Sequence, residues 1–136
     1  MPIVGFNFSK LDAEKHTNFM PKKKVNSDLR ISSVEKEKIN IGQSDDVVKF
    51  SFEFKVTYED SGSVSLVGHV LYMDEPKKIE SLLKSWKDGK KIPVDLMELV
   101  LNTILFRCNL KALALEQDIT LPPHFRLPRV VPKVGN

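Results

Sequence analysis

The side chains best suited to chemistry are few in this sequence, and they stand far apart. No two of the three histidines, His16, His69 and His124, have the spacing of a pair of metal ligands. We expect two of them on the surface and one packed against a sheet. The single cysteine, Cys108, can form no disulfide within the chain, and its neighbours at helical spacing are apolar. We therefore predict that Cys108 packs in the core as a small hydrophobic residue and is not a nucleophile.

Sequence motifs of common enzyme classes are missing. The six glycines include no Gly-x-Gly, and no serine stands in a Gly-x-Ser-x-Gly elbow. The adjacent acids Asp45-Asp46 and Glu59-Asp60 fall in expected turns, where solvent surrounds carboxylates. We predict that the protein is not an enzyme and needs no cofactor and no metal. An enzyme of unknown type is the third hypothesis, after two binding functions given below.

Composition indicates one domain of ordinary globular type. The chain has 136 residues, of which 41% are hydrophobic and 29% charged. The net charge of +3 permits contact with RNA or with acidic proteins but does not require it. The amino-terminal residues lack the pattern of a signal peptide, and no run of about 18 apolar residues could span a membrane. We expect a cytoplasmic protein without membrane contact.

Alternation of apolar and polar residues predicts strands in the first half of the chain. The clearest strand covers residues 48–58, where large apolar side chains occupy every second position. A loop at 59–63 leads to a return strand at 64–72. Weaker patterns predict a short edge strand at 3–8 and a strand at 25–33. Residues 10–19 could pair as a further strand or form an irregular segment. Together these segments predict an antiparallel sheet of about four to five strands.

Two helices are predicted in the second half. The first covers residues 75–88, with Asp74 as its cap and Gly89 at its end. The second covers residues 94–117. Strands followed by helices are typical of the α+β class, and we expect both helices on one face of the sheet.

The second helix is apolar around most of its circumference. A helix on one sheet needs an apolar arc of only about 100°. This one should therefore also contact a second subunit or a large host. Its polar residues form one narrow stripe: Asp95, Glu98, Asn102, Asn109 and Glu116. The candidate residues of the apolar interface are Leu96, Leu99, Phe106, Leu110 and Phe125.

The carboxyl-terminal residues 118–136 are rich in proline and should form an extended tail, which could lie in a groove of this protein or of a partner. Basic residues in this tail have no acidic neighbours, and a lysine cluster precedes the strand at 25–33. Such cations could bind phosphates of RNA, or they could simply maintain solubility. The candidate RNA-binding residues are Lys22, Lys23, Lys24, Arg126, Arg129 and Lys133.

This order of elements resembles the SecB-like family of protein-export chaperones. The resemblance is carried by the strands at 48–58 and 64–73, the helix near 75–87, the long apolar helix and the segment Leu121-Pro122-Pro123-His124-Phe125. It covers residues 29–130 as an architecture, and it is closer to archaeal relatives than to the bacterial proteins. The resemblance implies tetramers that pair through sheet edges and helices, apolar grooves for unfolded chains, and no cofactor.

The chain also departs from that family. Bacterial SecB is strongly acidic, whereas this chain is basic, so docking to the export motor is not expected. We predict a single SecB-like domain, residues 1–136, with an amino-terminal extension at 1–24 and the tail at 118–136. The leading hypothesis is a homo-oligomer, a dimer or tetramer, that holds unfolded or nascent polypeptide. The alternative is a ribosome-associated protein, a constituent of the large subunit that contacts rRNA through basic loops and the tail.

Overall fold

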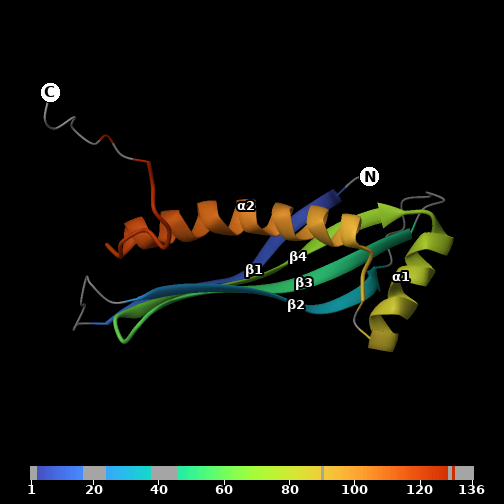
Figure 1. Cartoon of the computed structure of the whole chain (residues 1–136), viewed down its shortest axis with the longest axis horizontal. Helices are drawn as coiled ribbons and strands as arrows, with labels where there is room; N and C mark the ends of the chain where they lie inside the picture. The colour runs from blue at the N-terminus through green and yellow to red at the C-terminus, as the bar shows by residue number, and fades with distance from the viewer. Residues whose placement is uncertain (1–2, 17–23, 38–45, 90, 129, 131–136) are drawn as a thin grey trace, which may run out of the picture.

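The computed structural model describes residues 3–16, 24–37, 46–89, 91–128 and 130. Its described part is an α+β structure in which a sheet precedes two helices, as predicted (Figure 1). The elements are β1 (Ile3–Lys15), β2 (Val25–Glu37), β3 (Asp46–Tyr58), β4 (Gly62–Asp74), α1 (Pro76–Gly89) and α2 (Val94–Asp118).

The sheet is antiparallel with the strand order β1-β4-β3-β2, so β1 and β2 form its edges. The edge strands are longer than their sequence patterns indicate, because each pairs along almost the full length of a strong central strand. Residues 3 to 15 accordingly belong to the sheet, so the edge strand is longer than the one predicted at 3–8, and the amino-terminal extension at 1–24 stays a prediction. Residues 17–19 lie outside the described part.

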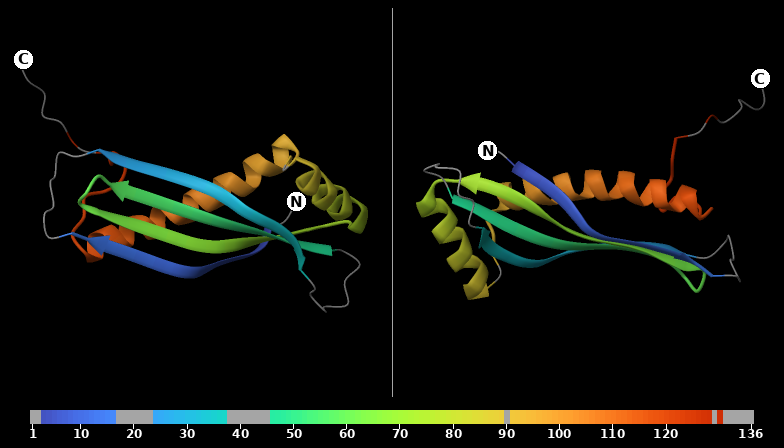
Figure 2. Two further views of the ribbon diagram at one scale, coloured as in Figure 1. Left: turned by 90° about the horizontal axis from the view of Figure 1, so that it is seen from below. Right: turned by 180° about the vertical axis from the view of Figure 1, so that it is seen from behind.

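One face of the sheet carries the core. The six alternating large side chains of β3, from Val48 to Tyr58, are all between 0% and 2% exposed, which confirms the period-two prediction. Val64, Leu66, Val70 and Tyr72 of β4 extend this buried face. The long helix α2 lies diagonally across it (Figure 2). The opposite face of β3 carries lysine, serine, glutamate and threonine side chains.

The short helix α1 packs across one end of the sheet, where it contacts β2, β3 and β4 and buries Ile79 and Leu82 (Figure 1). Asp74 does not cap the first turn of this helix as expected. Its Oδ1 atom accepts a hydrogen bond at 2.8 Å from the backbone N–H of Glu75, its immediate neighbour. Its Oδ2 atom accepts one at 2.7 Å from the hydroxyl of Tyr72. Asp74 therefore fixes the junction between β4 and α1.

No helix within the described ranges is long and apolar enough to cross a membrane.

The edge strand β1 bends toward α2 near its amino-terminal end (Figure 1). Its pairing with β4 shifts by one residue between Phe8 and Lys10. Gly68 of β4 lies beside this irregularity. A Cβ atom at Gly68 would lie 2.2 Å from the carbonyl oxygen of Asn7 and 2.9 Å from the Phe52 ring. Only glycine fits at this contact.

We therefore expect Gly68→Ala to lower the free energy of unfolding by about 1–3 kcal/mol or more, since the added methyl group meets backbone as well as a ring. Chemical denaturation measures this change. Gly89→Ala is the matched control, because the nearest atoms to a Cβ at Gly89 lie 3.9 Å away. An unchanged denaturation midpoint for Gly68→Ala would contradict the close approach of β1.

Candidate binding surface on α2

The contact between α2 and the sheet is a narrow stripe. The buried side chains of α2 recur at every fourth position, and all of them are 5% exposed or less. They are Leu96, Val100, Ile104, Cys108, Ala112 and Glu116. Side chains four apart lie on one side of a helix, so the remaining apolar residues of α2 point elsewhere.

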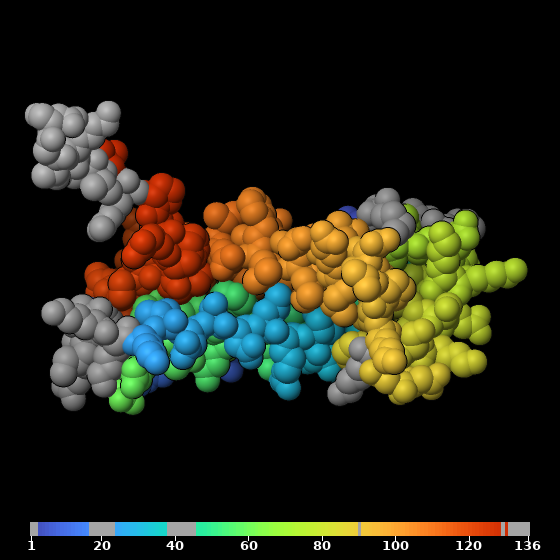
Figure 3. All heavy atoms as spheres, viewed as in Figure 1, coloured from blue at the N-terminus to red at the C-terminus, as the bar shows by residue number. Residues whose placement is uncertain are grey.

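The outer face of α2 exposes large apolar side chains. Phe106 is 64% exposed and Leu110 is 53% exposed, while Leu99 and Leu113 are half-buried. We call these four residues the outer strip. Positions 99, 103, 106, 110 and 113 alternate in steps of four and three, the spacing of helices that pair with other helices. In Figure 3, the middle of α2 (orange) lies along the upper side of the molecule, between the red tail and α1.

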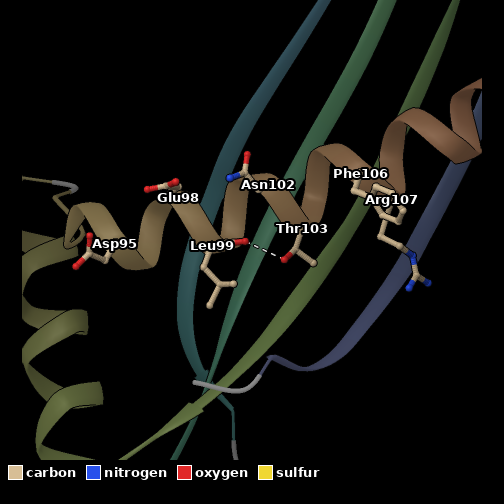
Figure 4. A pocket seen from close by; sticks show the side chains of 7 residues that line it. All are labelled: Asp95, Glu98, Leu99, Asn102, Thr103, Phe106 and Arg107. Carbon is tan, nitrogen blue, oxygen red and sulfur yellow. Dashed lines mark hydrogen bonds between the residues drawn. The ribbon is translucent and has the colours of Figure 1, made fainter. Parts of the chain in front are cut away.

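The first half of the outer face is hollowed to about 640 Å³. Seven α2 side chains line it: Asp95, Glu98, Leu99, Asn102, Thr103, Phe106 and Arg107 (Figure 4). The Thr103 hydroxyl donates to the Leu99 carbonyl oxygen at 2.8 Å, so it is used within the helix (Figure 4). Two carboxylates at one end and a guanidinium at the other provide charge for binding. They do not form a nucleophile–base pair.

Arg107 also connects α2 to the edge of the sheet. Its guanidinium carbon lies 4.8 Å from the centre of the Phe6 ring, in a cation–π contact. Phe6 in turn packs on Phe8 and Phe52, with ring centres 5.0 Å and 5.4 Å away. This cluster holds the bent end of β1 beside the hollow.

The tail folds back at the end of α2. After a turn at Thr120, Leu121 is buried, and the chain continues without helix through Pro128. A second hollow, of about 440 Å³, lies between the tail and α2. Its lining residues are Leu113, Glu116, Gln117, Leu121, Pro123 and Leu127. Leu127 and Phe125 remain more than 40% exposed at its margin.

Glu116 is not part of a solvated polar stripe, which corrects the sequence prediction. The side chains of Glu116 and His124 are each 1% exposed and lie against each other, with 2.7 Å between Oε2 and Nδ1, a contact that is an ion pair when the imidazole is protonated. His124 Nε2 lies 2.8 Å from Oδ1 of Asn109, which is half-buried. His124 is thus a histidine packed against the sheet, with its ring 6.0 Å from that of Phe54. The spacing of four residues that continues from Ala112 to position 116 is the feature of the sequence that indicates burial of Glu116.

The structure separates the predicted interface residues. Leu96 lies in the core against the sheet, because it begins the buried stripe, and it is not available to a partner. Leu99, Phe106, Leu110 and Phe125 remain at least partly accessible.

Of the predicted RNA-binding residues, Lys24 and Arg126 are exposed. The other four, Lys22, Lys23, Arg129 and Lys133, lie outside the described residues. Within the described ranges, no three His, Cys, Asp or Glu side chains could together hold a metal ion.

Cys108 is fully buried, which confirms its assignment to the core. Burial raises the pKa of its thiol to about 12. An unfolded thiol ionises with a pKa of about 8.5. At pH 8 to 9 the reactive thiolate therefore forms almost only in unfolded molecules.

We expect Cys108 to react with a disulfide reagent at pH 8 at the rate of global unfolding, and in full once denaturant is added. Absorbance at the wavelength of the released thiolate measures both rates. Rapid labelling of the folded protein at pH 8 would show that α2 opens locally.

Comparisons with known proteins bear on the fold. No protein-family model matches the chain, and no curated protein matches it in sequence. Its structure is similar to that of a SecB-like chaperone from Mycobacterium tuberculosis, solved in complex with a ChAD peptide from an antitoxin. The match has a TM-score of 0.54 at 14% identity and covers 98% of this chain and 92% of that chain. This chain has a SecB-like fold. The predicted SecB-like architecture is thereby confirmed. Nothing in the comparison supports the archaeal type or the ribosomal alternative, which stays a prediction from sequence.

Proposed function

We propose that this protein is a non-enzymatic SecB-like binding protein that holds unfolded or nascent polypeptide in the cytoplasm. The observation that carries the proposal is the exposure of Leu110, on a helix whose opposite side packs on the sheet, and of Leu127, at the hollow between this helix and the tail. Exposed apolar side chains that gather in one place are typical of a binding surface. The similar chaperone was solved with a bound peptide, which supports a polypeptide as the ligand.

We assign polypeptide binding to the second half of the outer face. Leu110 lies on the same helix as Leu113, which with Leu127 lines the hollow between α2 and the tail. Flexible leucine side chains accept many apolar sequences, because their contacts depend on area and not on fixed hydrogen bonds. Backbone groups of an extended client would remain in contact with water at this open surface.

The double variant Leu110→Ser, Leu127→Ser should lose most suppression of aggregation of a chemically denatured client, measured by light scattering at equimolar ratio. Both side chains are more than 40% exposed, so the free energy of unfolding should change by only about 0.5 kcal/mol per site. Val94→Ser is the matched control, since Val94 is 78% exposed but lines neither hollow. Equal suppression by the double variant and the wild type would refute this assignment.

We further propose that a second copy of the chain covers the first half of the outer face. Glu98 and Arg107 lie at equal distances in sequence on either side of Asn102-Thr103, and so do Leu99 and Phe106. An antiparallel pair of α2 helices centred there would place Glu98 opposite Arg107 and Leu99 opposite Phe106 of the second copy. This match of charge and apolar surface supports the predicted homo-oligomer.

Glu98→Arg and Arg107→Glu should each shift the protein toward monomer, because each places like charges opposite one another in the pair. The double variant should restore assembly by exchanging the two charges. Native mass spectrometry at several protein concentrations measures the subunit number. The antiparallel pairing would be contradicted by a wild-type monomer at high micromolar concentration. It would also be contradicted by a double variant that assembles no more than the single variants do.

A further inference from the structure

We propose that the cleft between the end of α2 and β3 is a binding site for an extended Leu-Pro-Pro-His segment, and that the chain fills this site with its own residues Leu121–His124. The proposal deepens the function proposed above, because it names one site and the class of peptide that fits it. The proposal is supported by the contacts that residues 122–124 make with β3 and with the end of α2.

The cleft recognises the backbone of this segment. The hydroxyl of Tyr58, on β3, donates a hydrogen bond to the carbonyl oxygen of Pro122. The backbone N–H of His124 donates one to Oε1 of Glu116 at 3.2 Å. Side chains that hold the main chain of an extended segment are typical of peptide recognition in trans.

The composition of the segment matches the groups that the cleft offers. Pro122 and Pro123 have no backbone N–H, so the amide of His124 is the only such donor in residues 122–124, and Glu116 binds it. Prolines also favour an extended conformation before binding. Leu121 supplies the buried apolar side chain.

The imidazole is recognised at both nitrogens. Nδ1 lies 2.7 Å from Oε2 of Glu116, and Nε2 lies 2.8 Å from Oδ1 of Asn109. Each ring nitrogen thus faces one side-chain oxygen of the cleft. The Glu116 carboxylate thereby contacts both the backbone N–H and the imidazole ring of His124. A leucine or phenylalanine at this position would keep the backbone N–H that binds Oε1 but would leave Oε2 of the buried carboxylate facing an apolar side chain, so the site selects histidine.

The attachment of the tail is suited to exchange. The desolvation of buried polar groups offsets much of their attraction, so the contact of Glu116 with His124 selects one partner more than it strengthens binding. Among the described residues after Leu121, every side chain except those of Pro122 and His124 is exposed. Thr120 connects α2 to the segment with a φ of 60°, a left-handed conformation that β-branched residues rarely adopt. Release of the segment would relax this strain.

The test uses a fluorescent peptide with the sequence of residues 119–128 and the full-length chain. The wild type should bind it weakly, because its own tail occupies the cleft. The His124→Ala chain should bind it at least about tenfold more tightly, since the apparent Kd falls as the open fraction rises. His69→Ala is the matched control, because His69 lies on β4 with Asn7 as its neighbour, and it should bind like the wild type.

Two outcomes would overturn the proposal: no tighter binding by the His124→Ala chain, or equal binding of a peptide that itself carries H124A. A measurement on the wild type covers the case in which the His124→Ala chain does not fold. Saturating peptide should accelerate hydrogen exchange at the His124 amide, which the closed tail protects. Unchanged exchange would also refute the proposal. None of these readings depends on the aggregation assay, so holding of clients and occupation of the cleft fail separately.

Discussion

The packing of α2 on the aromatic face of the sheet is the contact on which the rest of the structure depends. Alternating side chains of β3 present a continuous apolar surface, and α2 meets it with small and medium-sized residues such as Val100, Cys108 and Ala112. Small side chains at the contact let the helix lie close to large ones on the sheet. The same geometry limits what the sheet can cover, because only one side of a straight helix can face it. The exposed outer strip is a direct consequence.

The end of the buried stripe explains the position of the tail. The every-fourth pattern continues past Ala112 and places Glu116 against the sheet, where a carboxylate needs partners. His124, Asn109 and the backbone of the tail surround it. Burial raises the pKa of the Tyr58 hydroxyl, and the nearby carboxylate of Glu116 raises it further, so the tyrosine belongs to the same polar cluster. Within the described residues, the tail is thus part of the core at Leu121 and His124, while residues 125–128 are exposed.

The two halves of the outer face differ in chemistry, and this difference organises the proposed function. The first half combines acidic residues with Arg107 around Leu99 and Phe106, a pattern suited to one defined partner. The second half offers leucines beside a proline-rich tail, a pattern that accepts varied apolar segments. In the proposed function neither half needs a catalytic motif, since burial of apolar surface would supply the binding energy.

The sequence by itself determined the class of fold, the strand at 48–58, both helices and the burial of Cys108, because these follow from periodicity within single segments. It also predicted that α2 carries more apolar surface than one sheet can cover. Tertiary structure decided the length of β1 and β2, the burial of Leu96, and the meeting of Glu116 with His124. These depend on strand pairing and on a turn at Thr120, which bring together residues whose own neighbours in sequence indicate only an edge strand, an exposed face and an extended tail.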